Sequence, residues 1–242
     1  MAKVIKIKSE LNTKKNKTWW HSIFALFFSI LFLGIGFAVF SRVKSVSIIL
    51  FILSFILFAI YSRKNKEYNI LKSGVQGEKE TCNILRDLPK NYTIITNPVI
   101  HYKGKENELD TVVIGENGIF IIESKNYRGT VYGKTSEQMW KQIKKGKNHE
   151  TYEKEVKNPV KQSDIQRRKM SEMLTRTGVN ADVVSILYFV DSRTKLKISD
   201  DANLGITIIN NENDLIDYIT NTKSKRKISS TDRAKIIKVL KN

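Results

Sequence analysis

Residues 109–129 read LDTVVIGENGIFIIESKNYRG, which is two short apolar runs around the turn signal NG at positions 117–118. Asn-Gly between β-forming residues is a strong hairpin signal. If these two residues form the turn, strand pairing places Asp110, Glu123 and Lys125 on one face, at the outer end of the hairpin. Both faces are apolar, which predicts a central hairpin covered on both sides, where an unpaired charge is costly.

The segment before the hairpin contributes another acid. Residues 67–88 are predicted to form an amphipathic helix that ends before Pro89. Glu78 falls on the apolar stripe of this helix, which consists of Leu71, Val75, Cys82 and Leu85. A helix that covers the acidic end of the hairpin would bring three carboxylates together with one lysine.

The rest of the chain alternates between strand and helix patterns. Strands are predicted over residues 92–100, 129–133, 182–190 and 206–209, helices over 160–177, 212–219 and 231–240, and a polar, loop-rich segment over 141–155. The predicted order is αβββαβ, followed by a further strand and helices. This order is typical of an α/β fold with a mixed central sheet flanked by helices.

The composition excludes several classes of protein. The chain has 242 residues, 41% of them hydrophobic, and a formal net charge of +18. This hydrophobic content excludes a disordered chain, and the length allows one globular domain with an appendage. A single cysteine and three dispersed histidines exclude a disulfide scaffold and a zinc module. The excess of Lys and Arg predicts anionic partners.

Two uncharged apolar runs, residues 18–41 and 45–62, are long enough to cross a bilayer. A cleaved signal peptide or a buried core helix explains them less well, because the first run is too long for a signal peptide and another follows at once. Six lysines precede the first run and three basic residues follow the second, whereas the connecting loop carries only Arg42 and Lys44. The positive-inside rule predicts a hairpin in the cell membrane with both termini and the soluble domain in the cytoplasm.

Three segments are therefore predicted along the chain. Residues 1–17 form a basic cytoplasmic N-terminus, residues 18–62 a transmembrane helical hairpin, and residues 63–242 a cytoplasmic domain. The domain is expected to fold without the hairpin, since it has its own sheet and helices.

Three carboxylates beside a lysine suit metal-assisted chemistry. Carboxylate oxygens bind Mg²⁺ or Mn²⁺, and such an ion polarises a phosphate oxygen and lowers the pKa of a bound water. Glu78, Asp110 and Glu123 are the candidate metal ligands, and Lys125 would orient the water or offset developing charge. The alternative is a structural ion-pair network in which Lys125 neutralises Asp110 and Glu123.

Three short motifs carry a family resemblance. They are Gly77-Glu78, ELD at residues 108–110, and GIFIIESKNYRG at residues 118–129. Together they resemble the NERD (nuclease-related) domain, a family of the PD-(D/E)xK nuclease-like superfamily. The resemblance covers residues 74–174 and implies a restriction-endonuclease-like core.

The resemblance also implies roles for individual residues. Asp110, Glu123 and Lys125 would form the core catalytic motif, and Glu78 would be the acid of the first helix. The segment NPVKQ at residues 158–162 resembles the family's segment before the next helix, which makes Gln162 the accessory polar residue of the site. Asp110 follows a leucine rather than the proline of the superfamily's name, and the carboxylate that does the chemistry is kept.

Basic residues near the candidate site predict contacts with nucleic acid phosphates. They are Lys141, Lys144, Lys145 and Lys147 near Trp140, and Arg167, Arg168 and Lys169 on the helix predicted over residues 160–177. The alternative for each cluster is a solvated surface, and the alternative for Trp140 to stacking on a base is a place in the core. Nucleic acid, DNA in particular, and the lipid bilayer are the expected partners; the sequence identifies no protein partner.

Two classes of function follow from the sequence. The first is a membrane-anchored nuclease that hydrolyses phosphodiester bonds at the cytoplasmic face, with Mg²⁺ or Mn²⁺ as cofactor. The second is a non-catalytic membrane-tethered module of the same fold, which binds nucleic acid or a protein and uses its buried charges for structure. The combination of acids and a lysine in the motifs favours catalysis.

Overall fold

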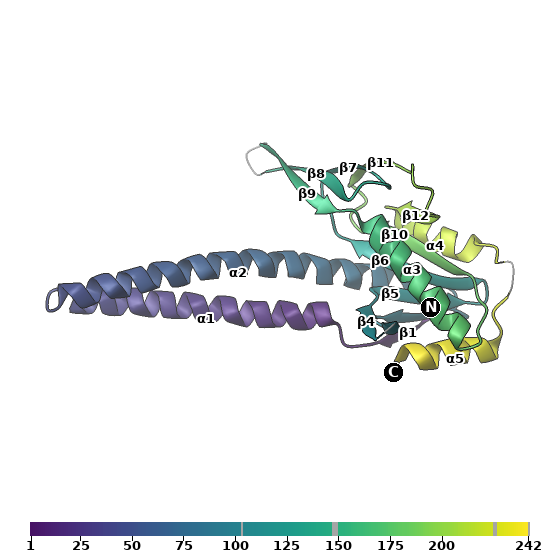
Figure 1. Ribbon diagram of the computed structural model, residues 1–242, viewed down its shortest axis with the longest axis horizontal. Helices are drawn as coiled ribbons and strands as arrows, with labels where there is room; N and C mark the ends of the chain where they lie inside the picture. Colours follow the sequence, from purple (N-terminus) through teal and green to yellow (C-terminus); the bar gives the residue numbers. More distant parts are fainter. Residues whose placement is uncertain (103, 147–149, 225–226, 242) are drawn as a thin grey trace. The chain divides into compact units, whose positions relative to one another are not determined.

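The computed structural model describes residues 1–102, 104–146, 150–224 and 227–241 (Figure 1). It divides into a helical unit, Ser9–Val75, and an α/β unit formed by Met1–Lys8 and Gln76–Asn242. The helices are α1 (Glu10–Val39), α2 (Lys44–Leu85), α3 (Pro159–Arg176), α4 (Glu212–Asn221) and α5 (Ser230–Lys241). The strands are β1 (Lys3–Lys6), β2 (Thr93–Thr96), β3 (Val99–Tyr102), β4 (Lys105–Glu108), β5 (Thr111–Gly115), β6 (Gly118–Lys125), β7 (Thr130–Lys134), β8 (Met139–Lys145), β9 (Thr151–Lys157), β10 (Val183–Phe189), β11 (Lys195–Ser199) and β12 (Ile206–Ile209).

In the helical unit, α1 packs against the first part of α2. The hydroxyl of Ser29 donates to the carbonyl of Ser54 at 2.9 Å, and the hydroxyl of Ser54 donates to the carbonyl of Ser29 at 2.8 Å. Gly36 leaves room for Phe51, whose ring would lie 2.6 Å from a Cβ at position 36. Most of the large apolar side chains of both helices are exposed, and both helices are long and apolar enough to cross a membrane.

Helix α2 is longer than the sequence pattern indicated. The apolar run at residues 45–62 and the amphipathic helix predicted over residues 67–88 form one continuous helix, Lys44–Leu85. The residues between them, 63–66, include no Pro or Gly, and Arg and Lys are good helix formers. The change in composition therefore does not mark an end of the helix.

The main sheet of the α/β unit has the strand order β1-β2-β5-β6-β10-β12. Strands β2, β5 and β6 form an antiparallel meander, and β10 joins β6 in parallel. The outer strands β1 and β12 are also parallel to their neighbours. The predicted mixed α/β sheet is therefore present.

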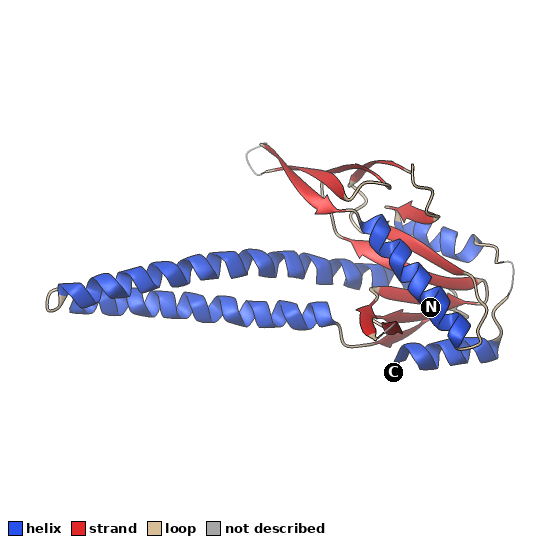
Figure 2. Ribbon diagram, viewed as in Figure 1, coloured by secondary structure: helices blue, strands red, loops and turns tan. Residues whose placement is uncertain are grey.

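Helices cover both faces of the main sheet (Figure 2). On one face, Phe120 and Ile122 lie in a core cluster with Leu85 of α2 and Leu215 of α4. On the other face, the apolar residues of β5 and β6 lie in a cluster with residues of α3 and α5: Met170, Leu174, Ile236 and Leu240. The hairpin is thus central and doubly covered, as its two apolar faces predict.

The register of the hairpin differs from the expected one. Gly115 pairs with Gly118, so the turn residues are Glu116 and Asn117 rather than the NG dipeptide. Asn117 is fixed by distant partners, because it accepts from the Tyr92 hydroxyl at 3.0 Å and donates to the Ile219 carbonyl at 2.7 Å. The shift is two residues, so each side chain stays on its expected face. Continuing this register brings Asp110 opposite Glu123.

A second sheet, with the order β11-β7-β8-β9, occupies the region predicted to be loop-rich. The prediction of loops over residues 141–155 is wrong for the described part, because β8 and β9 form an antiparallel pair. Only Trp140, Gln142 and Val156 are buried on these two strands. Because most residues of β8 and β9 are polar or charged, the alternation of apolar and polar residues that identifies a half-buried strand is weak in this sequence.

The N-terminal segment also differs from the boundaries expected from the sequence. Residues 3–6 form β1, whose backbone pairs with β2 from Lys3↔Thr93 to Lys6↔Thr96. Ala2 is buried in the same core cluster as Phe120. The α/β unit consequently includes Met1–Lys8, whereas the predicted soluble domain began at residue 63.

Candidate active site

The ends of three elements meet at the candidate site. Asp110 immediately precedes β5, Glu123 and Lys125 end β6, and Glu78 lies near the end of α2. The hydroxyl of Ser124 bonds that of Thr81 at 3.0 Å, which ties the end of β6 to α2. The four residues expected to form the site therefore share one end of the main sheet.

Asp110 is held by the backbone of the neighbouring strand. The amide of Ser124 donates to Oδ2 of Asp110 at 2.8 Å. Burial raises the pKa of Asp110 well above its ordinary value, and the charge of Glu123 raises it further. Lys125 and the Ser124 amide act in the opposite direction.

Glu123 is 2% exposed and is bonded through both carboxylate oxygens. Its Oε1 accepts from Nζ of Lys125, and its Oε2 accepts from Nε2 of Gln166 at 2.9 Å. Burial alone would lower the pKa of Lys125, but the charges of Glu123 and Asp110 outweigh burial and raise it. Lys125 is consequently an ammonium group set between two acids.

Glu78 is the third acid and is partly buried. Burial raises the pKa of Glu78 to about 7, and the neighbouring charges of Glu108 and Glu123 contribute in the same direction. Asn97 opposes them, because its Nδ2 donates to Glu78 Oε2 at 3.3 Å and to Glu108 Oε1 at 3.1 Å. The backbone of Asn97 has a φ of 56°, in the left-handed region that residues other than glycine seldom adopt.

The glutamine that contacts Glu123 lies one helical turn after Gln162, the residue expected from the sequence. Gln162 is exposed on α3, whereas Gln166 is buried and bonds Glu123. A helical period identifies the difference, since Ser163, Gln166, Met170 and Leu174 form the buried stripe of α3. The sequence interpretation did not apply this period to the polar residues, and it missed Gln166 and Asn97.

The expected basic residues lie in two different settings. On α3, Asp164 pairs with both Arg167 at 2.8 Å and Arg168 at 2.9 Å, and Lys169 donates to Asn107 at 2.6 Å. These three residues therefore have partners within the α/β unit. None of these bonds joins them to Glu78, Asp110 or Glu123 of the candidate site.

The lysines near Trp140 lie on the second sheet. Lys141, Lys144 and Lys145 are on β8, and Lys147 is outside the described residues. Alternation along the strand puts Lys141 and Lys145 on one face and Lys144 on the other. Trp140 is 1% exposed, and its Nε1 donates to the Lys134 carbonyl at 2.8 Å, so the core interpretation of this residue is confirmed.

The chemistry of the donor set fits a hard divalent cation. Carboxylate oxygens are the ligands that Mg²⁺ and Mn²⁺ prefer, and the charge of Glu123 contributes to the raised pKa of both Asp110 and Glu78. Gln166 Oε1 is a buried oxygen with no hydrogen-bond donor among the described residues. Within the described part of the chain, however, no three acidic, His or Cys residues are already arranged around a common point for a metal.

Comparison with known proteins bears on the family resemblance. Residues 73–190 match the family described as NERD, nuclease-related domain. An uncharacterized protein of Bacillus anthracis is 37% identical over 71 residues, which cover 28% of this chain and about a third (34%) of that relative's length. No solved structure matches the chain. The match confirms the resemblance carried by the motifs: residues 73–190 of this chain are similar to the nuclease-related domain of the NERD family.

Proposed function

We propose that this protein is a membrane-anchored, metal-dependent nuclease that hydrolyses phosphodiester bonds of nucleic acid, DNA in particular. One observation carries the proposal: Asp110, Glu123 and Lys125 form a buried, charged cluster at one end of the main sheet, beside Glu78. Buried charge is costly, and strongly shifted pKa values concentrate at functional sites. The match to a nuclease-related family and the order of the core elements also support a PD-(D/E)xK type of core.

The residues of the site would divide the work as follows. Asp110 and Glu123, with Glu78, would hold Mg²⁺ or Mn²⁺, which when bound polarises a phosphate oxygen and activates a water. Lys125 would leave Glu123 to orient that water or to offset the developing charge on the phosphate. Gln166 would keep the Glu123 carboxylate in position through the bond at 2.9 Å.

The apolar helices support membrane attachment in this proposal. Both α1 and α2 are long and apolar enough to cross a bilayer. By the positive-inside rule, the basic residues that flank them support a cytoplasmic location for both termini and the α/β unit. The enzyme would then act on nucleic acid at the inner face of the cell membrane.

A specific observation favours a second candidate function. The ammonium group of Lys125 contacts Glu123, as it would in a purely structural ion pair. In that case the domain would be a membrane-tethered module that binds nucleic acid or protein and has no catalytic activity.

Thermal unfolding separates the two functions. The nuclease proposal expects Mg²⁺ or Mn²⁺ to raise the Tm of the purified chain in detergent, because a ligand that binds only the folded state stabilises it. Asp110→Asn or Glu123→Gln should abolish this shift together with cleavage of DNA or RNA. Lys125→Ala should keep the shift and lower cleavage by about 100-fold or more.

The structural alternative expects the reverse order of effects. Lys125→Ala would leave buried carboxylates without their counter-charge and cost about 3–5 kcal/mol of stability. A wild-type Tm that neither ion changes, together with no cleavage of DNA or RNA, would reject the nuclease proposal and support the tethering module.

A further inference from the structure

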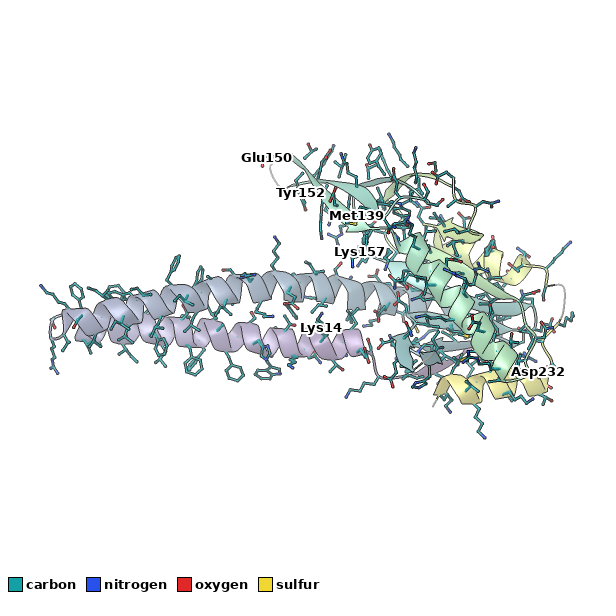
Figure 3. The ribbon with its side chains drawn as sticks, in the orientation of Figure 1. Lys14, Met139, Glu150, Tyr152, Lys157 and Asp232 are labelled. Carbon is teal, nitrogen blue, oxygen red and sulfur yellow. The ribbon has the colours of Figure 1, made fainter. Side chains whose placement is uncertain are left out.

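The second sheet has one face in the core and one face in solvent. Val131, Trp140 and Val156 point inward and form a core cluster with residues of β10. The residues that alternate with them form the opposite face, which we call the outer face. Figure 3 labels Met139 and Lys157, which pair with each other on this face.

The outer face is strongly basic. Six exposed lysines lie on it, distributed over all four strands: Lys134, Lys141, Lys145, Lys157, Lys195 and Lys197. The strands contribute two acids to the same face, Glu153 and Glu155. Lys141 pairs with Glu153 at 3.0 Å, and the other five lysines have no ion pair within the part of the chain that the structure describes. Positive charge therefore exceeds what the face itself neutralises.

An aromatic ring lies between two of these lysines. Tyr132 pairs with Lys141 on β8 and with Lys197 on β11, so the three side chains stand next to one another across the sheet. Nζ of Lys197 is 5.2 Å from the centre of the Tyr132 ring. An open cavity of about 900 Å³ lies over this part of the face, and its lining includes Tyr132, Met139 and Ile143.

We propose that the outer face of the second sheet binds a single-stranded segment of nucleic acid. Its bases would stack on Tyr132 and contact Met139, while its phosphates would contact the lysines on either side. Aromatic residues set among basic ones bind single strands because every unpaired base offers a flat face for stacking. A duplex hides these base faces, so it would gain only the phosphate contacts.

The dimensions of the face agree with this occupant. Four strands at a spacing of about 4.8 Å extend over about 15 Å, which is enough for a few nucleotides. The choice of nucleic acid as the polymer rests on the proposed function, which gives the same domain a phosphodiester substrate. Binding to the outer face is separate from the carboxylate site and requires no metal.

Fluorescence anisotropy of the full chain in detergent, with EDTA present, tests the proposal. The probes are a labelled 20-nucleotide oligo(dT) and a 20-base-pair duplex. The single strand should bind at least tenfold more tightly at the same salt concentration. Tyr132→Leu, which removes the ring but keeps an apolar side chain, should weaken single-strand binding by about tenfold. Tyr132→Phe, which keeps the ring, should bind the single strand as tightly as the wild type.

The lysines are tested through the dependence of affinity on salt. Lys195→Ala combined with Lys197→Ala should lower the slope of log K against log salt by about one to two, since each removes a phosphate contact. Lys235→Ala combined with Lys238→Ala removes the same charge from exposed positions of α5 and should leave affinity for the single strand nearly unchanged.

Three outcomes would overturn the proposal. They are equal affinity for single strand and duplex, unchanged binding by Tyr132→Leu, and binding of poly-glutamate as tight as that of oligo(dT), which would show a surface that recognises charge alone. EDTA prevents metal-dependent cleavage, so the binding assay does not depend on the proposed nuclease activity. If the wild-type protein binds the single strand but cleaves no substrate in a separate assay with Mg²⁺ or Mn²⁺, the proposed nuclease is rejected and this inference stands.

Discussion

At the scale of single residues, the site depends on groups that modify the charge of its acids. Glu78 has a pKa raised from 4.5 to about 7, first by burial and then by neighbouring acids. Asn97 opposes this effect with its amide and holds Glu78 and Glu108 together. The acid of α2 is therefore placed near the point of half-protonation at neutral pH, where a cation could compete with the proton.

The raised pKa of Glu78 predicts how the stability of the metal-free protein depends on pH. Between pH 4.5 and 7 the folded state holds a proton that the unfolded state has lost, so the contribution of Glu78 to stability falls as pH rises. Glu78→Gln has no charge to bury and should raise the free energy of unfolding at pH 8 by about 1–3 kcal/mol, with little effect at pH 4. Urea unfolding in EDTA at both values measures the difference, and an equal effect at both would contradict the prediction.

The two glutamines of α3 provide a matched pair. Gln166→Ala removes the donor to Glu123 Oε2, and a buried charged acceptor left unpaired should cost about 1–3 kcal/mol of unfolding free energy. Gln162→Ala is the same change at an exposed position and should stay within about 0.5 kcal/mol of the wild type. Denaturant unfolding of both variants is the measurement; equal losses would mean that the side chain of Gln166 does not support Glu123.

At the scale of elements, β1 joins the beginning of the chain to the main sheet. Its pairing with β2 leaves the helical unit, Ser9–Val75, as an insertion between β1 and the rest of the α/β unit. Lysines of this segment support the positive-inside rule in the sequence interpretation, and in the structure Lys3 and Lys6 also belong to a strand. The residues from which the topology is predicted thus also take part in the pairing of β1 with β2.

Deleting residues 1–8 should destabilise the α/β unit. The deletion exposes the edge of β2 and removes Ala2 together with the partly buried Val4 and Ile5 from the core, so a loss of about 2–4 kcal/mol is expected. Lys3→Ser combined with Lys6→Ser keeps the backbone pairing and serves as the control, with a change below about 1 kcal/mol. If deletion and double substitution have the same effect on the unfolding midpoint, the segment contributes charge and not a strand.

At the scale of the whole molecule, a basic α/β unit is attached to two apolar helices. Most large apolar side chains of α1 and α2 are exposed, and so large an exposed apolar surface is unusual in a soluble protein. The reciprocal Ser29 and Ser54 bonds satisfy the hydroxyl groups inside this helix pair. Such internal pairing is what a polar group requires within a bilayer.

The predicted sidedness can be measured with introduced cysteines in a Cys82→Ser background. Arg42→Cys lies in the connection between α1 and α2, and an impermeant maleimide added to intact cells should label it. Lys235→Cys on α5 should react only after the membrane is opened, because the positive-inside rule places the α/β unit in the cytoplasm. Labelling of Lys235→Cys in intact cells would reverse the predicted topology.

The sequence by itself determined the features that depend on local pattern. The apolar runs, the helix over α3, the central hairpin and its two faces follow from periodicity, which reports which side chains share a face. The placement of Asp110, Glu123 and Lys125 at one end of the hairpin also followed from the sequence, since a shift of two residues in the register leaves each side chain on the same face.

Only the tertiary structure decided the features that depend on distant partners. Tyr92 and Ile219 bond Asn117 and so fix the position of the turn. The N-terminal segment forms β1 by pairing with β2. Trp140 and Val156 are buried in a core cluster, and their burial stabilises β8 and β9 although most other residues of these strands are polar or charged. The bond from Gln166 to Glu123 and the raised pKa of Glu78 likewise result from side chains that meet across the fold. Register, pairing and electrostatic environment are properties of contacts between segments, and no local window of sequence contains them.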